Sequence, residues 1–271
     1  MKDHISAIKK LVLTLKASPQ MHALIVSGAA GWGKTTAVDQ ALAEANIKAV
    51  HLGSYSTPLN FFNFLFSNQD RFVVIDDSAG LFTDQSSMAI LKAATWPQGG
   101  HRTLRWGSTS SKAAVDEFVF TGKFVVVCNS FPSGPDAEAV KSRSFPRRIE
   151  VGTENAKLLL RAAASDKAWY SNTKNAKAVC EFLVQRITSE SLMQISYRTL
   201  RMGYELAEHN PDSWQELLGD MVRPLLEDPK VLIKKLAKED LKVKDQLFQF
   251  ERATGLKRRT FFKYRKELSL S

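Results

Sequence analysis

The chain has 271 residues, of which 44% are hydrophobic and 24% charged, and this composition excludes a mainly disordered protein. Its 38 Lys and Arg against 28 Asp and Glu give a net charge of +10, which favours a polyanionic partner such as nucleic acid over a basic protein without one. Its only two cysteines, Cys128 and Cys180, exclude a disulfide framework or cysteine metal cluster, and no apolar run is long enough to cross a membrane.

The first part of the chain alternates helices with short apolar strands. An amphipathic helix is expected at the start, where Ile5, Ile8, Leu11, Leu13 and Leu15 are available to pack. Five strands are expected at 23–27, 47–52, 72–75, 124–128 and 147–151. Helices are expected at 34–45, from Thr57-Pro58, at 85–95 and at 137–142, with a hairpin at 103–106 and 118–120. The alternation predicts an α/β domain over 1–152 with a five-stranded parallel sheet.

From residue 153 onwards the pattern is helical. The expected helices are 154–164, 175–187, 196–208, 213–226, 229–238, 245–253 and 258–268. The change of pattern predicts an all-helical domain over 153–226, the helical lid, followed by a basic helical tail over 227–271. We therefore expect three domains in all.

A glycine-rich motif, GAAGWGKTT, lies between the first strand and the next helix. Such a loop curls its backbone N–H groups around phosphate oxygens, and the helix that follows adds the positive end of its dipole. We expect the lysine to reach the β- and γ-phosphates and Thr35 to hold Mg²⁺. The predicted ATP-binding residues are Gly28, Ala29, Ala30, Gly31, Trp32, Gly33, Lys34, Thr35 and Thr36.

Trp32 is an unusually large residue for such a loop. Because main-chain groups hold the phosphates, its side chain can point away from them. It either packs on the protein itself or contacts an adjacent subunit or nucleic acid.

The third strand ends in the acidic pair Asp76-Asp77. We expect Asp76 to bind Mg²⁺, directly or through water, and Asp77 to orient and deprotonate the attacking water. The alternative is a strand that ends in a turn-forming pair of aspartates.

The order of motifs over residues 1–210 resembles that of AAA+ ATPases, closest to the clamp-loader and helicase-loader-like branch and to phage or mobile-element ATPases. The motifs are the glycine-rich loop, the strand with two aspartates, a strand ending in Asn129, a Ser-Arg pair before the last strand and the helical segment SYRTLR. The resemblance implies that Asn129 is sensor 1, Arg143 an arginine finger and Arg198 sensor 2. Each has a simpler alternative as a cap or surface charge, and Arg147 and Arg148 are rival finger residues.

Two consequences follow from the resemblance. An arginine finger supplied by a neighbour implies a homo-oligomer, a ring or helical filament, that assembles with ATP. Most AAA+ proteins have Asp-Glu where this chain has Asp76-Asp77, and the shorter side chain predicts slow hydrolysis used for switching.

The tail from Glu227 to Ser271 has 13 basic and 7 acidic residues. Within it, a helix, a break at Thr254-Gly255 and a second, basic helix follow the layout of a helix-turn-helix. The alternative is a basic amphipathic helix that closes the lid or binds a partner protein. The predicted DNA contacts of the tail are Lys257, Arg258, Arg259, Lys263, Arg265 and Lys266.

The hairpin region 100–112 is a second predicted DNA surface, because His101, Arg102, Arg105, Trp106 and Lys112 combine cations with an aromatic ring. An ordinary exposed hairpin is the alternative.

Together these features predict a cytoplasmic, Mg²⁺-dependent, DNA-binding AAA+ ATPase of a bacterial or phage-infected cell. It would load or remodel a partner protein, such as a helicase or recombinase, on DNA during replication, transposition or a related process. The alternatives are an ATP-gated DNA-binding switch and a protein-remodelling ATPase whose tail binds an adaptor.

Overall fold

A computed structural model describes residues 2–53, 55–97, 99–107, 113–188, 191–222, 229–239, 241–254 and 256–268. The chain divides into two compact units. We call Met1–Val151 the core unit and Gly152–Ser271 the helical unit.

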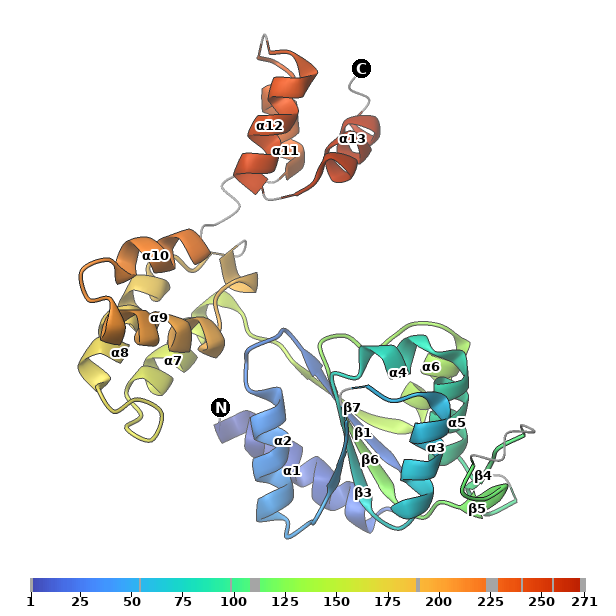
Figure 1. Cartoon of the computed structure of the whole chain (residues 1–271). Coiled ribbons are helices and arrows are strands. Elements are labelled where there is room, and N and C mark those ends of the chain that lie inside the picture. The colour runs from blue at the N-terminus through green and yellow to red at the C-terminus, as the bar shows by residue number, and fades with distance from the viewer. Residues whose placement is uncertain are drawn as a thin grey trace. The chain divides into compact units, whose positions relative to one another are not determined.

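The core unit is built on a five-stranded sheet in which every neighbouring pair is parallel (Figure 1). The strand order is β2-β3-β6-β1-β7. The bounds are β1 Ala23–Gly28, β2 Val50–Leu52, β3 Phe72–Asp76, β6 Lys123–Cys128 and β7 Ser144–Ile149.

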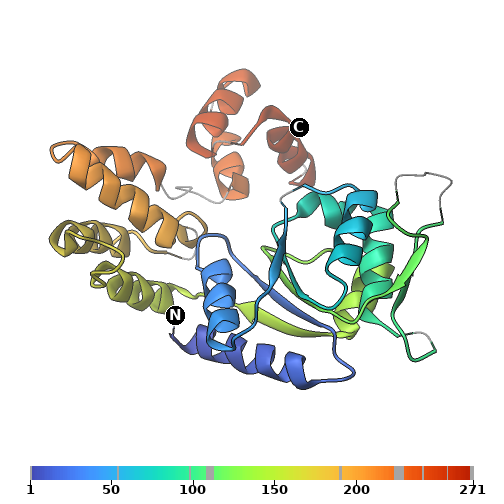
Figure 2. The same cartoon turned by 60° about the horizontal axis from the view of Figure 1, so that its bottom comes forward.

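Helices cover both faces of this sheet (Figures 1 and 2). Because side chains alternate along a strand, Leu24 and Val26 of β1 pack on one face and Ala23 and Ile25 on the other. The first face is covered by α1 Lys2–Ala17 and α2 Lys34–Glu44, and the second by α3 Pro58–Ser67, α4 Ala79–Thr83, α5 Gln85–Thr95 and α6 Pro135–Ser142. An antiparallel hairpin, β4 Thr103–Arg105 with β5 Glu117–Val119, adjoins the second face.

The helical unit begins with a group of helices that pack tightly where a glycine replaces a side chain. A Cβ atom on Gly203 would lie 2.5 Å from Val179 and 2.6 Å from Leu218, so this glycine allows α9 to approach its two neighbours closely. The elements are α7 Thr153–Ala164, α8 Thr173–Val184, the 3₁₀ turn η1 Ser191–Met193, α9 Tyr197–His209 and α10 Trp214–Met221.

The three last helices share a small core of their own, centred on Ile233, Phe250 and Phe261, each 0% exposed. They are α11 Pro229–Leu236, α12 Val243–Thr254 and α13 Arg258–Glu267. The predicted boundary at 226/227 lies outside the described residues, as does Gly255 of the predicted turn.

Several details differ from the expectations. The second strand begins at Val50 rather than at 47. The last strand begins at Ser144 rather than at 147, and it includes Pro146, which an edge strand such as β7 tolerates. In α1, Val12 is buried whereas Leu13 is 43% exposed, because one helical face alone meets the sheet. The short helix α4 was not predicted.

Candidate nucleotide site and basic surfaces

The motif residues meet at the carboxyl edge of the sheet. In the parallel register, Ser27 pairs with Cys128 and Asp76 pairs with Val127. Asn129, which follows β6, accepts a hydrogen bond from the Gly28 N–H at its backbone oxygen, at 3.3 Å. The glycine-rich loop, the acidic pair and Asn129 therefore lie side by side.

The loop needs its glycines for backbone conformation and for space. Gly28, Gly31 and Gly33 have φ angles of 147°, 78° and 74°, which L side chains rarely adopt. A Cβ atom on Gly28 would lie 2.3 Å from the backbone oxygen of Ile149. Gly33 is the N-cap of α2, so the helix starts directly at Lys34 with its positive dipole end toward the loop.

Lys34 is a buried cation, 8% exposed, at the centre of this edge. Its ammonium group donates three hydrogen bonds, each 2.9 Å long. The acceptors are the backbone oxygens of Gly28 and Ala29 and the side-chain oxygen of Asn129. The lysine predicted to reach the phosphates and the residue predicted to be sensor 1 are thus in direct contact.

Thr35 and Asp76 form a second contact, in which the threonine hydroxyl donates to a carboxylate oxygen at 2.9 Å. Two such oxygens fit Mg²⁺, which is held in proteins by one or two side chains together with water and phosphate oxygens. Asp77 has a left-handed backbone with φ 48°, its N–H donates to the Val127 oxygen at 2.9 Å, and its side chain is exposed.

The remaining loop residues differ in exposure. Ala29, Ala30 and Thr36 are exposed, whereas Trp32 is buried, with 5% of its surface exposed. Its burial agrees with packing on the protein itself and leaves little of the ring for a partner.

A cleft of about 530 Å³ adjoins the loop. Gly28 and Asn129 line it together with Lys141 of α6 and Arg148 of β7. Burial raises the pKa of the neighbouring Cys128 thiol to about 11, so this cysteine stays a thiol at neutral pH. Sequence reasoning did not find Lys141, because only the packing of α6 brings it to the cleft.

The register of β7 separates the rival finger residues. Arg148 pairs with Ser27 and Arg147 with Val26, both near their own loop, whereas Ser144 pairs with Ala23 at the opposite end of β1. Arg143 precedes Ser144 and is six residues before Ile149, the partner of Gly28, so it is roughly 20 Å along the strands from its own loop, at about 3.3 Å per residue. Its guanidinium lies 4.7 Å from the centre of the Trp96 ring.

Arg198, the predicted sensor 2, is an exposed residue in the first turn of α9. It belongs to the helical unit, and its role stays a prediction.

Comparisons with known proteins agree with this architecture. A point mutant of RuvB from Thermotoga maritima has a TM-score of 0.54 and 13% identity, covering 98% of this chain and 87% of that chain. The RuvB Holliday junction branch migration motor of the same organism has a TM-score of 0.50 and 16% identity, covering 97% and 87%. The chain has the AAA+ fold. The predicted α/β fold class, with its five-stranded core and helical regions, is thus confirmed.

Sequence comparison adds a phage relative. An uncharacterised 36.7 kDa protein of Enterobacteria phage T4, from the nrdC–mobD intergenic region, is 25% identical over 222 residues. The match spans 73% of this chain and 67% of that protein. No family model matches the sequence.

The hairpin of this AAA+ core differs from the predicted DNA surface. Arg102 is buried, 7% exposed, and donates hydrogen bonds to the backbone oxygens of Ala94 at 2.9 Å and Gly122 at 2.8 Å. It therefore joins α5 to the segment before β6, and the prediction that it contacts DNA is wrong. Arg105 is exposed and pairs across the hairpin with Glu117 at 2.6 Å.

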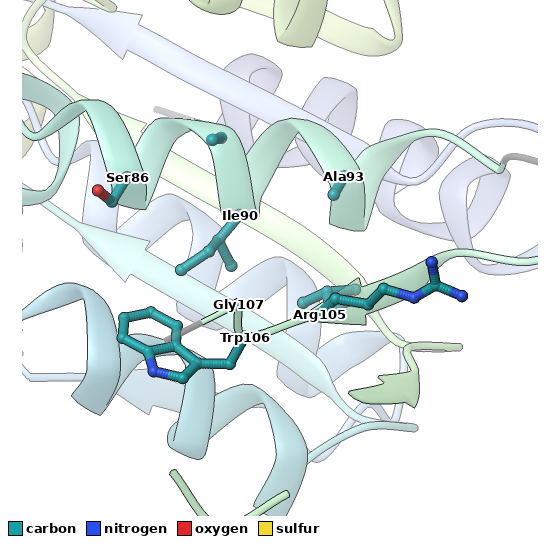
Figure 3. Close-up of a pocket in the computed structure, with 8 residues that line it drawn as sticks. Ser86, Ile90, Ala93, Arg105, Trp106 and Gly107 are labelled. Carbon is teal, nitrogen blue, oxygen red and sulfur yellow. The ribbon is translucent and has the colours of Figure 1, made fainter. Parts of the chain in front are cut away.

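Trp106 is half-buried on the second face of the core unit. It packs against Phe62, with ring centres 5.6 Å apart, and lines a pocket of about 440 Å³ with Ile90 of α5. Figure 3 shows the Trp106 ring near Ile90, while the Arg105 side chain extends away from it. Lys112 lies outside the described residues.

Five of the six tail residues that were predicted to contact DNA lie at the surface. Lys257, Arg258, Arg259, Lys263 and Lys266 are exposed. Arg265 instead is 7% exposed and donates to the Gln246 side-chain oxygen at 2.6 Å, so it joins α13 to α12. The prediction that Arg265 contacts DNA is therefore wrong.

The described residues contain neither a cluster of metal-binding side chains nor a membrane-spanning helix. No group of three His, Cys, Asp or Glu side chains there could hold a metal ion. No helix in the same ranges is long and apolar enough to span a membrane.

Proposed function

We propose that this protein is a Mg²⁺-dependent AAA+ ATPase that assembles with ATP and remodels a partner on DNA in a bacterial or phage-infected cell. The observation that carries the proposal is the pair of contacts Lys34–Asn129 and Thr35–Asp76 at one edge of the sheet. They place a cation, a polar side chain and two metal-binding oxygens around a phosphate-binding loop.

Each side chain has a separate task in this scheme. Lys34 neutralises the β- and γ-phosphates, and Thr35 and Asp76 hold Mg²⁺, which would supply further positive charge to the phosphate oxygens. Asp77 orients the attacking water and takes its proton, and Asn129 helps to place that water. Arg198 contacts the γ-phosphate from the lid.

The position of Arg143 supports a shared site. A finger roughly 20 Å along the strands from its own loop is too far to act there, so it serves the ATP of the next subunit. Its place over Trp96 holds the cation at the surface of the core unit. The likeness to RuvB, described as a Holliday junction branch migration motor, supports a protein that acts on DNA. We propose a helicase or recombinase as the class of partner.

The Lys34→Ala variant tests the nucleotide dependence of assembly. Without its ammonium group the loop loses the main cation for the phosphates, so we expect no oligomers in electron micrographs with an ATP analogue. Lys48→Ala, which removes an exposed lysine of the same unit, is the matched control and should assemble like the wild type. Oligomers of Lys34→Ala in normal amounts would contradict the proposal.

A second candidate is an ATP-gated switch that assembles on DNA and scarcely hydrolyses ATP. The short, exposed Asp77 favours it, since this carboxylate has one methylene fewer than the glutamate usual in the fold. Steady-state ATPase assays with and without DNA separate the two candidates. A protein-remodelling ATPase, in contrast, predicts no salt-sensitive DNA binding.

A further inference from the structure

The outer face of α13 combines exposed cations with an exposed aromatic ring. The five residues are Arg258, Arg259, Phe262, Lys263 and Lys266. At 3.6 residues per turn they all fall within about 140° of the helix circumference, with Phe262 between Arg258 and Lys266. Phe262 is 41% exposed, and the Arg258 guanidinium lies 5.4 Å from the centre of its ring.

The opposite face of α13 fixes the helix in place. Phe261 is 0% exposed and packs against Phe250, with ring centres 5.2 Å apart. The hydrogen bond from Arg265 to Gln246 adds a polar contact between the same two helices. The basic face with Phe262 is thus presented by a docked helix.

The charge of this face selects a polyanion. Glu267 is the only acidic residue of α13, and it lies 2.8 Å from Lys230 and 3.8 Å from Lys263. These two pairs offset its charge locally. The structure shows no ion pair for Arg259 and Lys266 among the described residues, and Arg258 meets a carboxylate only through its backbone N–H, which donates to Glu251 at 2.9 Å. Their free side-chain charges suit a line of phosphates.

The Phe262 ring favours single-stranded DNA over duplex DNA. In a duplex groove a phenyl ring can contact a thymine methyl group but cannot hydrogen-bond to a base edge, and the faces of the bases are covered by their neighbours. In an unpaired strand the bases are free to stack on an aromatic ring while the phosphates contact cations on either side.

We propose that the outer face of α13 binds an unpaired DNA strand, with Phe262 stacked on a base and the four cations at the phosphates. This rests on the DNA-binding part of the proposed function and adds the class of strand. The Phe262 ring supplies the preference for a single strand, and the cations supply affinity for either form.

Fluorescence anisotropy of the full chain with labelled oligothymidylate and with a mixed-sequence duplex, at one salt concentration, tests the proposal. Phe262→Ala should weaken binding of oligothymidylate about 5- to 150-fold, the range for loss of one stacked base, and change duplex binding by less than about twofold. Phe262→Tyr should restore strand binding. Lys263→Gln should weaken binding of both forms and lower their salt dependence.

Phe248→Ala is the matched control, since Phe248 is a 64% exposed phenylalanine on α12, and it should leave both affinities unchanged. Unchanged strand binding of Phe262→Ala, or an equal loss for both forms, would overturn the inference while leaving DNA binding in place. If the wild type binds neither form, the DNA part of the proposed function fails as well, as it would for a tail that binds an acidic protein.

Discussion

Gly28 shows how one residue couples the sheet to the loop. Its φ of 147° and the 2.3 Å approach that a Cβ atom would make to the Ile149 backbone oxygen leave no room for a side chain. We expect Gly28→Ala to lower the free energy of unfolding by about 2–4 kcal/mol, from backbone strain and overpacking. Urea denaturation of the wild type and the variant measures this difference in the free energy of unfolding.

The control is Gly53→Ala, where an added Cβ has nothing within 4 Å and the change should stay within about 0.5 kcal/mol. Equal stability of the two variants would show that β1 and β7 are not packed as described.

His22 lies among cations at the amino edge of the sheet. It is 5% exposed, and its Nδ1 lies 3.4 Å from the Lys123 ammonium, which donates to the Ser18 and Met21 backbone oxygens. Burial, together with Arg102 and Lys123, lowers the pKa of His22 to about 4. Burial and Arg102 also lower the pKa of Lys123 to about 8.

These shifts predict a stability that falls in mild acid. The unfolded chain protonates His22 near its ordinary pKa of 6.5 and the folded chain only near 4. The contribution of neutral His22 is therefore complete above about pH 6.5 and is lost as the pH falls toward 4. The midpoint of urea unfolding should drop between about pH 7 and about pH 5, and less so in His22→Gln. His209→Gln, at an exposed histidine, should keep the wild-type dependence; an equal pH dependence in all three proteins would refute this explanation.

At the scale of elements, the three tail helices depend on a small core. Phe261→Ala removes a fully buried ring and should lower the free energy of unfolding by about 3–5 kcal/mol, which is enough to unfold α11–α13. Hydrogen exchange should then show lost protection in these helices but not in the core unit, and nucleotide binding should persist. Phe262→Ala, its exposed neighbour, is the control; retained protection of the tail in Phe261→Ala would contradict the core described.

Elements were more predictable from sequence than the positions of single charges. Apolar runs such as the one before Asp76 predicted β1, β3 and β6, because buried parallel strands are hydrophobic on both faces. The edge strands β2 and β7 have fewer buried apolar residues, and their starts were predicted at 47 and 147 rather than at 50 and 144. Arg102 and Arg105 look alike in sequence, yet only Arg102 meets the backbone oxygens of Ala94 and Gly122. Such contacts depend on packing between separate segments, as does the Arg265–Gln246 contact over 19 residues.

The same holds for the candidate nucleotide site: its motifs could be predicted from local sequence, whereas the placement of single charges could not. The motif spacing predicted the glycine-rich loop and the acidic pair, and the resemblance to AAA+ ATPases implied Asn129. The sequence left three arginines as rival fingers. The strand register places Arg148 beside Ser27 and Arg147 beside Val26, near the loop, whereas Arg143 precedes the first residue of β7 at the far end of the strand.

At the scale of the whole molecule, the account depends on an ATP site completed by a neighbouring subunit. The Arg143→Ala variant keeps its own glycine-rich loop but lacks the arginine finger that acts at the neighbour's ATP. The Asp77→Asn variant keeps this arginine but lacks the carboxylate that activates water at its own ATP. Each variant alone should therefore hydrolyse almost no ATP.

The most direct test is the steady-state ATPase rate of an equal mixture of these two variants. Random mixed oligomers place an Asp77→Asn finger at half of the Arg143→Ala sites, so the mixture should regain about one quarter of the wild-type rate. A mixture as inactive as its components, or full activity of Arg143→Ala as an isolated subunit, would contradict the shared site.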